Sequence, residues 1–301
     1  MPSWNELFES VQQDKALEEK KKEFFKNLQS ITGRNYVVYF SCWQQKPGGP
    51  GGAFSIDDDD RNGFMNALHG LDKSKGLDLI LHTPGGDFAA TQSIVGYLYS
   101  FFSGDVRVIV PHTAMSAGTM IACASKEIIM GRHSNLGPID PQINGMPANE
   151  FVDLFSQALK DIQEGANIAY WQMTLQKFPP TFFGMCNNAI KASKKVVGQW
   201  LERSMLSGES QDKIENTVNY LADYHSHLQH NTRLMIDDLR NNTALKIVNL
   251  EDNQEFQENI LSLYHCYQIM AGQSNVSKLI ENQNSVKFVK QHSPILMGNP
   301  V

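Results

Sequence analysis

Two short turns in the sequence carry residues suited to chemistry at an acyl carbon. The first turn, TPGGD at 83–87, places Gly85 and Gly86 between a strand-like and a helix-like run, so backbone N–H groups can approach a ligand closely. The second turn, PHTAMSAG at 111–118, places Ser116 among small residues at the start of another helix-like run. A serine hydroxyl can act as a nucleophile, and paired N–H groups can stabilise an oxyanion.

Each turn also has an ordinary structural interpretation. A glycine pair between strand and helix can ease a tight turn or hold a phosphate, although the longer G-x-G-x-x-G pattern is absent. A serine in front of a helix is most often an N-cap. Chemistry is favoured here because two consecutive strand ends supply the donors and the hydroxyl together.

The elements that position these turns are repeated strand-turn-helix units. One unit has a helix at 88–102, and a second has a helix that starts near Ser116. Successive units of this kind require right-handed crossovers and a mainly parallel sheet, which predicts an α/β fold. The predicted strands, rich in apolar and mostly β-branched or aromatic residues, are 36–42, 77–82, 106–110, 127–130 and 245–250.

Three motifs, in this order, are similar to those of a known family. HTPGGDFAA at 82–90, VPHTAMSAGTMIACAS at 110–125 and LGPIDPQ at 136–142 resemble the SDH-type (serine dehydrogenase proteinase) family of Clp-fold serine proteases. Relatives of that family include signal peptide peptidase A and the Clp proteolytic subunit. The likeness covers residues 34–205 and implies a Clp/crotonase-like fold and a serine endopeptidase that needs no cofactor.

The resemblance also implies roles for residues of the two turns. Ser116 is implied as the nucleophile, and the N–H groups of Gly86 and Ala117 as the oxyanion hole, in the turn that begins at Gly85. Each such donor typically lowers the barrier by about 3 kcal/mol. A serine hydroxyl is a poor nucleophile until a base takes its proton, so the sequence must also supply a base.

The general base is harder to assign than the nucleophile. The Clp proteolytic subunit has a histidine about one strand and turn beyond its serine, where the stretch GPIDPQ offers Asp140 and no histidine. The peptidase A relatives instead use a lysine from a later helix, whose pKa is lowered by desolvation. A Ser/Lys dyad with Lys191 is therefore predicted, with Lys177, Lys194 and Lys195 as alternatives and a solvated lysine as the ordinary interpretation of each.

Histidines near the motifs are further candidates. His133 lies shortly before Asp140 and could form or support another base, while His82 and His112 stand beside the two turns. A buried histidine that bonds a turn carbonyl is the commoner case, and Asp140 could equally brace its loop. Asp140 is kept as a catalytic candidate, with His133 and His112 as supporting ones.

No motif predicts a metal site. The acidic run at 57–60 lacks EF-hand spacing and predicts a helix start capped by Asp57 or Asp58. HSH at 225–227, followed by LQH, lacks the HExxH arrangement and a clear carboxylate partner. The four cysteines lie far apart, without zinc or disulfide spacing, and fit reduced thiols in the cytoplasm.

Composition and charge exclude several classes of protein. With 301 residues, 41% hydrophobic and 19% charged, the chain can bury a full core and is not disordered. Its net charge of -6, with dispersed basic residues, leaves no footprint for nucleic acid. The N-terminus lacks the pattern of a secretory signal, and the longest apolar stretch is too mixed to cross a bilayer, so a cytoplasmic protein is expected.

Three regions are predicted along the chain. Residues 1–33 form a helical arm with one apolar face, residues 34–250 form the protease domain, and residues 251–301 form a helical segment with a polar tail. A peptide or protein is the expected substrate. Relatives of this fold bury their sites by assembling into rings or other oligomers, so a homo-oligomer is expected.

Two other functions compete with peptide hydrolysis. In the related crotonase group the same paired donors stabilise an acyl-CoA enolate, and Ser116 would then be incidental. A catalytically silent oligomeric scaffold would keep the fold and bind partners through its helical arm and C-terminal segment. A fluorophosphonate probe separates peptide hydrolysis from the crotonase-type reaction, because only an activated serine reacts with it.

Overall fold

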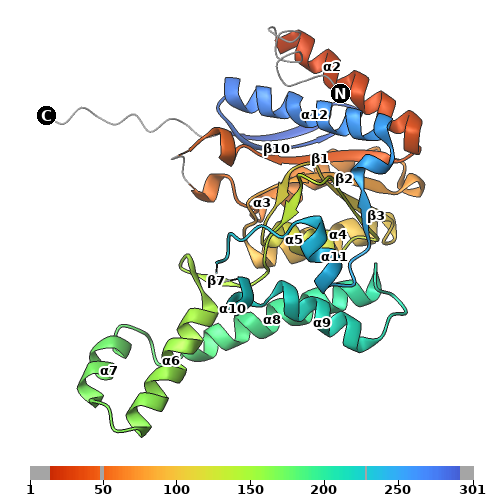
Figure 1. Ribbon diagram of the computed structural model, residues 1–301. Helices are drawn as coiled ribbons and strands as arrows, with labels where there is room; N and C mark the ends of the chain where they lie inside the picture. Colours follow the sequence, from red (N-terminus) through yellow and green to blue (C-terminus); the bar gives the residue numbers. More distant parts are fainter. Residues whose placement is uncertain (1–13, 48–50, 228, 292–301) are drawn as a thin grey trace, which may run out of the picture.

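A seven-stranded sheet runs through the middle of the protein (Figure 1), in a computed structural model that describes residues 14–47, 51–227 and 229–291. The strand order is β11-β10-β1-β2-β3-β5-β9, and every neighbouring pair from β1 to β9 is parallel. Only β10 and β11 run antiparallel to their neighbours. The predicted α/β class with a mainly parallel sheet is confirmed. The strands are β1 (Asn35–Ser41), β2 (Leu77–His82), β3 (Val106–Val110), β5 (Ile128–Met130), β9 (Ile247–Asn249), β10 (Val276–Asn282) and β11 (Lys287–Gln291).

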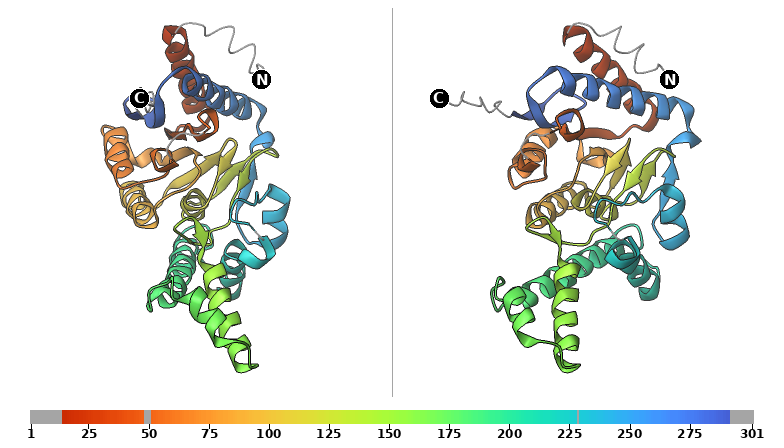
Figure 2. Two further views of the ribbon diagram at one scale, coloured as in Figure 1. Left: turned by 90° about the vertical axis from the view of Figure 1, so that its left-hand side faces the viewer. Right: turned by 60° about the vertical axis from the view of Figure 1, so that its left-hand side comes forward.

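Helices cover both faces of this sheet, which explains why its central strands are apolar along their whole length (Figure 2). Alternate residues of each strand enter the two layers, so that Leu79 lies in one core and Ile80 in the other. One layer contains α3 (Asp59–Leu68), α4 (Phe88–Phe102), α5 (Ala117–Cys123), α8 (Phe182–Arg203), α9 (Gln211–Leu221) and α11 (Ile236–Asn242). The other contains α2 (Asp14–Thr32) and α12 (Gln254–Gln273).

A helical arm projects from the body on the side away from α2 and α12 (Figure 1). It consists of α6 (Ala148–Gln163), α7 (Ile168–Leu175) and the first part of α8, and it has a small core of its own around Phe151, Phe182 and Cys186. Among the described residues, no helix combines the length and the apolar composition needed to cross a membrane. The remaining short elements are β4 (Thr113–Ala114), β6 (Asn135–Leu136), β7 (Gln142–Ile143), β8 (Met146–Pro147) and α10 (Tyr224–His227).

The first described helix packs against the last one. Phe25 and Leu28 of α2 are buried in the same core as residues of α12, and Asn27 Nδ2 donates to Asn259 Oδ1 at 3.0 Å. This helix occupies the later part of the predicted N-terminal arm, and residues 1–13 of that arm lie outside the described residues. Packing on its own domain therefore accounts for the apolar face of α2.

The region predicted as a polar tail differs from that expectation. After α12, residues 276–282 and 287–291 form β10 and β11, and β10 joins the sheet beside β1. The polar composition is misleading because Lys278 and Glu281 are not solvated: each is about 1% exposed and paired with an opposite charge. Residues 292–301 of the predicted tail lie outside the described part of the chain.

Candidate active site

The turns that follow β2 and β3 lie against each other. Thr83 N–H donates to Thr113 C=O at 3.1 Å and Met115 N–H donates to Thr83 C=O at 3.0 Å, which ties the turns by a short parallel bridge. Gly85 has a φ of 98°, and a Cβ placed on it would lie only 2.8 Å from Ser116 Cβ. The turn therefore needs glycine at this point, and the predicted donors and hydroxyl come together.

Ser116 precedes α5 but does not cap it. Its φ is 50° and its ψ is −114°, and its side chain makes no hydrogen bond to the start of the helix. Positive φ is uncommon for a residue other than glycine, and such strain is typically kept at functional sites. The Ser116 side chain is partly exposed. The N-cap interpretation therefore does not describe this serine, whose hydroxyl remains available.

Gly86 is held from its other side by Ile56. Ile56 N–H donates to Gly85 C=O, and Asp87 N–H donates to Ile56 C=O, both at 2.8 Å. A Cβ on Gly86 would lie 2.3 Å from Ile56 N, so a larger residue cannot be accommodated there. Within the described chain the Gly86 N–H takes no part in this ladder, and the Ala117 N–H, the first of α5, has no acceptor inside the helix.

A carboxylate and an imidazole form a pair beside these turns. His230 Nδ1 lies 2.8 Å from Asp140 Oδ1, and Gln142 Nε2 donates to Asp140 Oδ2 at 2.9 Å. Asp140 is 1% exposed, whereas the His230 side chain is 26% exposed. A buried carboxylate bonded to Nδ1 fixes the orientation of an imidazole and leaves Nε2 to exchange a proton.

Contacts between distant segments place this pair. The Thr119 hydroxyl on α5 lies 2.8 Å from Gly137 C=O and accepts the Gly137 N–H at 3.0 Å, which attaches the loop of Asp140 to α5. Leu136 and Leu234 exchange two backbone hydrogen bonds, of 3.1 and 2.9 Å, which brings the segment after α10 beside the same loop. Asp140 and His230 therefore meet although they are 90 positions apart.

One cavity of about 430 Å³ contains all of these groups. Its lining includes Ser116, the two glycines of the first turn, Asp140 and His230. Cavities of this size hold small ligands or side chains, and a few convergent polar groups on a largely apolar wall are typical of a binding site. The apolar part of the wall includes Phe88, Met120, Ile139, Ala189 and Ala192.

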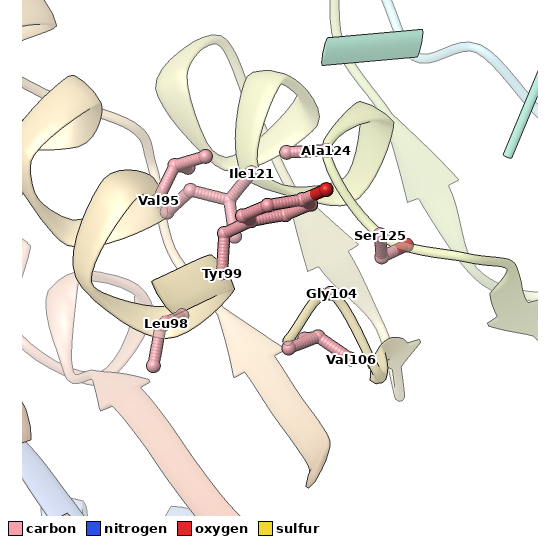
Figure 3. Close-up of a pocket in the computed structure, with 8 residues that line it drawn as sticks. All are labelled: Val95, Leu98, Tyr99, Gly104, Val106, Ile121, Ala124 and Ser125. Atoms are coloured by element: carbon pink, nitrogen blue, oxygen red, sulfur yellow. The ribbon is translucent and has the colours of Figure 1, made fainter. Parts of the chain in front are cut away.

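A second cavity lies away from this chemistry, between α4, β3 and α5 (Figure 3). It measures about 10 Å³, which is room for about one water molecule. Its walls are mostly aliphatic, with Tyr99 and Ser125 as the polar members. This cavity is a packing defect rather than a substrate site.

The segment that carries both turns and the Asp140 loop is similar to known proteins. Residues 52–170 match the ClpP-like SDH-type serine proteinase family. The match confirms the resemblance that the three motifs indicate, and it includes the glycine turn, Ser116 and Asp140. Lys191 and His230 lie outside the matched residues.

Two curated relatives of this SDH-type segment are uncharacterized proteins of Methanocaldococcus jannaschii. One is 42% identical over 99 residues, which are 33% of this chain and 34% of the relative. The other is 37% identical over 97 residues, which are 32% of this chain and 33% of the relative. The chain thus matches about a third of the length of each relative, and the likeness concerns the SDH-type core.

The lysines predicted as candidate bases lie outside the cavity that contains Ser116. Lys191 is exposed on α8, where its neighbours Ala189, Ala192 and Ser193 face the cavity instead. Lys194 Nζ donates to Asn219 Oδ1 at 3.1 Å. All four candidate lysines belong to the described residues and none lines the cavity. Lys177 lies in the loop between α7 and α8, and on α8 it is the small side chains that face the cavity.

The histidines singled out near the motifs are also outside the cavity. His133 is exposed, with Nε2 2.9 Å from Pro111 C=O. The rings of His112 and His82 lie 5.8 Å apart. Burial lowers the pKa of both, that of His82 well below its ordinary value. His82 is fully buried, His112 is half-buried, and neither lines the cavity.

His230 is the residue that sequence analysis did not select. It is the last residue of LQH, a stretch considered only for metal binding, and its partner Asp140 lies far away in sequence. In the described part of the chain no group of three His, Cys, Asp or Glu side chains is arranged to hold a metal ion. The available signal was indirect: an aspartate in the LGPIDPQ motif that lacked an imidazole partner nearby.

The acidic run at 57–60, at the start of α3, forms ion pairs with lysines. Lys278 Nζ lies 2.9 Å from Asp57 Oδ2 and 2.8 Å from Asp60 Oδ2, and Lys290 Nζ lies 2.7 Å from Asp57 Oδ1. Of the two predicted caps, Asp58 occupies the N-cap position without capping, whereas Asp57 Oδ1 accepts the Asp59 N–H at 3.0 Å. The carboxylates balance the buried charge of Lys278 on β10 and the partly exposed charge of Lys290 on the edge strand β11.

Proposed function

We propose that the protein is a serine endopeptidase in which Ser116 forms an acyl-enzyme, His230 is the general base and Asp140 orients His230. The observation that supports this most is that one cavity contains the uncapped, strained serine, the glycine turn and an imidazole bonded to a buried carboxylate. The match of residues 52–170 to serine proteinases supports the same class of reaction.

In the first step Ser116 Oγ attacks the carbonyl carbon of a peptide bond, and its proton passes to His230 Nε2. The 2.8 Å contact with Asp140 holds Nδ1–H and stabilises the imidazolium that forms. The carbonyl oxygen gains the negative charge and accepts hydrogen bonds from the N–H groups of Gly86 and Ala117.

In the second step the tetrahedral intermediate collapses and the carbon–nitrogen bond breaks. His230 gives its proton to the leaving amine, and the acyl group remains on Ser116 Oγ as an ester. A water molecule then attacks the acyl carbon while His230 takes its proton. The bond between the acyl carbon and Ser116 Oγ breaks, His230 returns the proton to Oγ, and the acyl group leaves as a carboxylic acid. Atoms and charge balance without a metal or another cofactor.

His230 takes the place of Lys191 in this proposal. A base must come within hydrogen-bond reach of the proton that it removes, and the His230 side chain lines the cavity of Ser116. Lys191 is exposed and does not line this cavity. The proposed site is therefore a Ser/His/Asp triad rather than a Ser/Lys dyad.

The same geometry weighs against the two competing functions. An enolate-stabilising enzyme needs the paired N–H donors but has no use for a serine held at positive φ or for an orientated His/Asp pair. The scaffold hypothesis rested on the lack of a defined base, and His230 supplies a candidate. Peptide hydrolysis is therefore the function that the site supports best.

We also propose a homo-oligomeric, cytoplasmic protein that acts on a peptide or protein substrate. The arm formed by α6, α7 and the first part of α8 supports association, because five of its large apolar side chains are more than half exposed: Leu159, Ile168, Tyr170, Met173 and Met185. Light scattering should give a mass of at least two chains, and a monomer at all concentrations would contradict it.

The test of the catalytic proposal is the rate of labelling by a fluorophosphonate. We expect wild type to be labelled, Ser116→Ala not to be labelled, and His230→Ala to be labelled much more slowly. Lys191→Ala is the matched comparison, expected to be labelled at the wild-type rate. Labelling that persists in Ser116→Ala contradicts the proposed nucleophile, and slow labelling of Lys191→Ala with normal labelling of His230→Ala contradicts the proposed base.

A further inference from the structure

Lys278 on β10 is a buried lysine that the catalytic proposal does not use. Its side chain is 2% exposed, and Nζ donates to three oxygens: Ser55 C=O at 2.5 Å, Asp60 Oδ2 at 2.8 Å and Asp57 Oδ2 at 2.9 Å. An ammonium group has three donors, so all of them are satisfied. The contact with Ser55 is to the backbone of a loop more than 220 positions earlier in the chain.

That loop continues directly into the segment that holds Gly86. Ser55 lines the cavity of Ser116, and the next residue, Ile56, makes the two 2.8 Å hydrogen bonds that flank Gly86. Ile56 is itself 1% exposed, and its backbone lies too close to Gly86 for any side chain. A displacement of the Ser55 carbonyl therefore passes through one peptide unit to the turn whose N–H is the proposed oxyanion donor.

We propose that Lys278 is a positioning residue for the oxyanion hole, fixing the Ser55 carbonyl and through Ile56 the direction of the Gly86 N–H. This inference rests on the proposed function. It assigns no contact with substrate to Lys278, which acts only through the backbone of the loop. A misplacement of about 1 Å at a catalytic group can reduce the rate by about 100-fold, so such support is significant for catalysis.

The surroundings of Lys278 explain why a lysine is suited to this position. Asp60 is 1% exposed and is fixed by the Tyr39 hydroxyl at 2.9 Å and by the Asp57 N–H at 3.0 Å, so the ammonium has a rigid counter-charge. Buried ion pairs add little stability compared with apolar residues of similar size. What an apolar side chain could not provide is a donor directed at the Ser55 carbonyl.

The same strand provides a matched control. Glu281 pairs with Lys21 at 2.9 Å, with side chains 1% and 2% exposed, and accepts a hydrogen bond from the Tyr267 hydroxyl at 2.8 Å. The chemistry is that of the Lys278, Asp60 and Tyr39 group, but this pair lies in the layer of α2 and α12. It makes no contact with the 55–57 loop among the described residues.

The experiment compares two double variants that each neutralise one buried pair. Lys278→Met/Asp60→Asn removes the donor to Ser55, and Lys21→Met/Glu281→Gln removes the control pair. With a peptide ester as substrate, we expect the first variant to lose about 10- to 100-fold in kcat while KM changes by less than about 3-fold. Its affinity for a peptide boronate, whose oxygen occupies the oxyanion hole, should fall by a similar factor. The control variant should keep kcat within about 2-fold of wild type.

Each outcome decides the inference. A folded Lys278→Met/Asp60→Asn protein that keeps wild-type kcat overturns it, and so does an equal loss of kcat in both double variants, which would indicate general destabilisation. If the methionine variant does not fold, Lys278→Gln/Asp60→Asn replaces it: the amide keeps the pair hydrogen-bonded but is too short to reach Ser55, and the same loss of kcat is expected. Wild type that neither turns over substrate nor labels at Ser116 refutes the proposed function itself, whereas active wild type with an equally active variant refutes only the role of Lys278.

Discussion

The two sides of the proposed site come from very different parts of the chain. Residues 83–140 contribute the glycine turn, Ser116 and Asp140 from consecutive units, joined by backbone bonds between neighbouring turns. His230 and Lys278 come from segments that reach the site only through long-range contacts, the bridge of Leu136 with Leu234 and the bond to Ser55. The proposed nucleophile and donors thus lie in neighbouring turns at the carboxyl ends of β2 and β3, whereas the proposed base and the backbone support come from distant segments. Each side can be broken separately.

The largest expected effect tests whether His230, the proposed base, and Ser116, the proposed nucleophile, act as one unit. Ser116→Ala and His230→Ala should each reduce kcat by about 10⁶-fold, and the double variant should be no worse than either, because neither group functions without the other. Peptide hydrolysis by purified protein provides the measurement. Additive losses in the double variant would contradict a shared step.

The next largest effect tests whether Asp140 orients His230. Asp140→Asn should keep the shape of the loop but disturb the tautomer of His230, and kcat should fall by about 10⁴-fold with KM little changed. Gln142→Leu, which removes only the second partner of Asp140, is the matched control and should cost about 10-fold at most. A loss for Gln142→Leu as large as that for Asp140→Asn would show that the loop, not the carboxylate, is required.

A smaller effect tests the local donors alone. Gly86→Ala should reduce kcat by about 10²- to 10³-fold, because its Cβ would lie 2.3 Å from Ile56 N and must displace the donor. Gly96→Ala is the control: it lies in α4 with open space around its Cα, and helix propensity should make the protein about 1 kcal/mol more stable without loss of kcat. Unfolding in urea measures the stability of both variants, and unchanged kcat in Gly86→Ala would remove Gly86 from the oxyanion hole.

The smallest effect concerns the core beneath the two turns. His82 is fully buried between the rings of Phe40 and Trp43, and burial holds its pKa well below the ordinary value. The unfolded chain binds this proton near pH 6.5 and the folded chain does not, so stability present above that pH is lost as pH falls. His82→Phe should remove a slope of up to about 1.4 kcal/mol per pH unit in the free energy of unfolding below pH 6.5.

The control for the acid prediction is an exposed histidine. His225→Asn is that control, because the side chain of His225 is 68% exposed and the substitution removes no buried group. Urea titrations of the three proteins between pH 7 and pH 5 provide the comparison. An identical slope in wild type and His82→Phe would show that other groups cause the acid sensitivity.

The contrast between residues 83–140 and the distant segments also explains which structural features the sequence predicts correctly. The 77–82 strand, the 88–102 helix and the 106–110 strand are found with the same bounds. The two strands are predictable because burial on both faces of the sheet requires a continuous apolar run, and the helix because its apolar residues recur with helical spacing. No residue pattern encodes the positive φ of Ser116 or its close approach to Gly85, but both residues belong to motifs that can be recognised in the sequence. These features lie within the segment that matches the SDH-type family.

There is a physical reason why the contributions of His230 and Lys278 could not be predicted from the sequence. His230 gains its role from an aspartate 90 positions away, and its own neighbourhood is polar and unremarkable in pattern. Lys278 and Glu281 make β10 look like part of a solvated tail, although both are buried in ion pairs. A buried charge is indistinguishable from a surface charge until its partner is placed in space, and that placement depends on the whole fold.

The most direct test of the central claim is a crystal structure of the fluorophosphonate adduct. We predict phosphorus bonded to Ser116 Oγ, His230 Nε2 within about 3.2 Å of an adduct or serine oxygen, and a phosphoryl oxygen within about 3.1 Å of the amide nitrogens of Gly86 and Ala117. Phosphorus on another residue, or a lysine Nζ in the place of the imidazole, would contradict it.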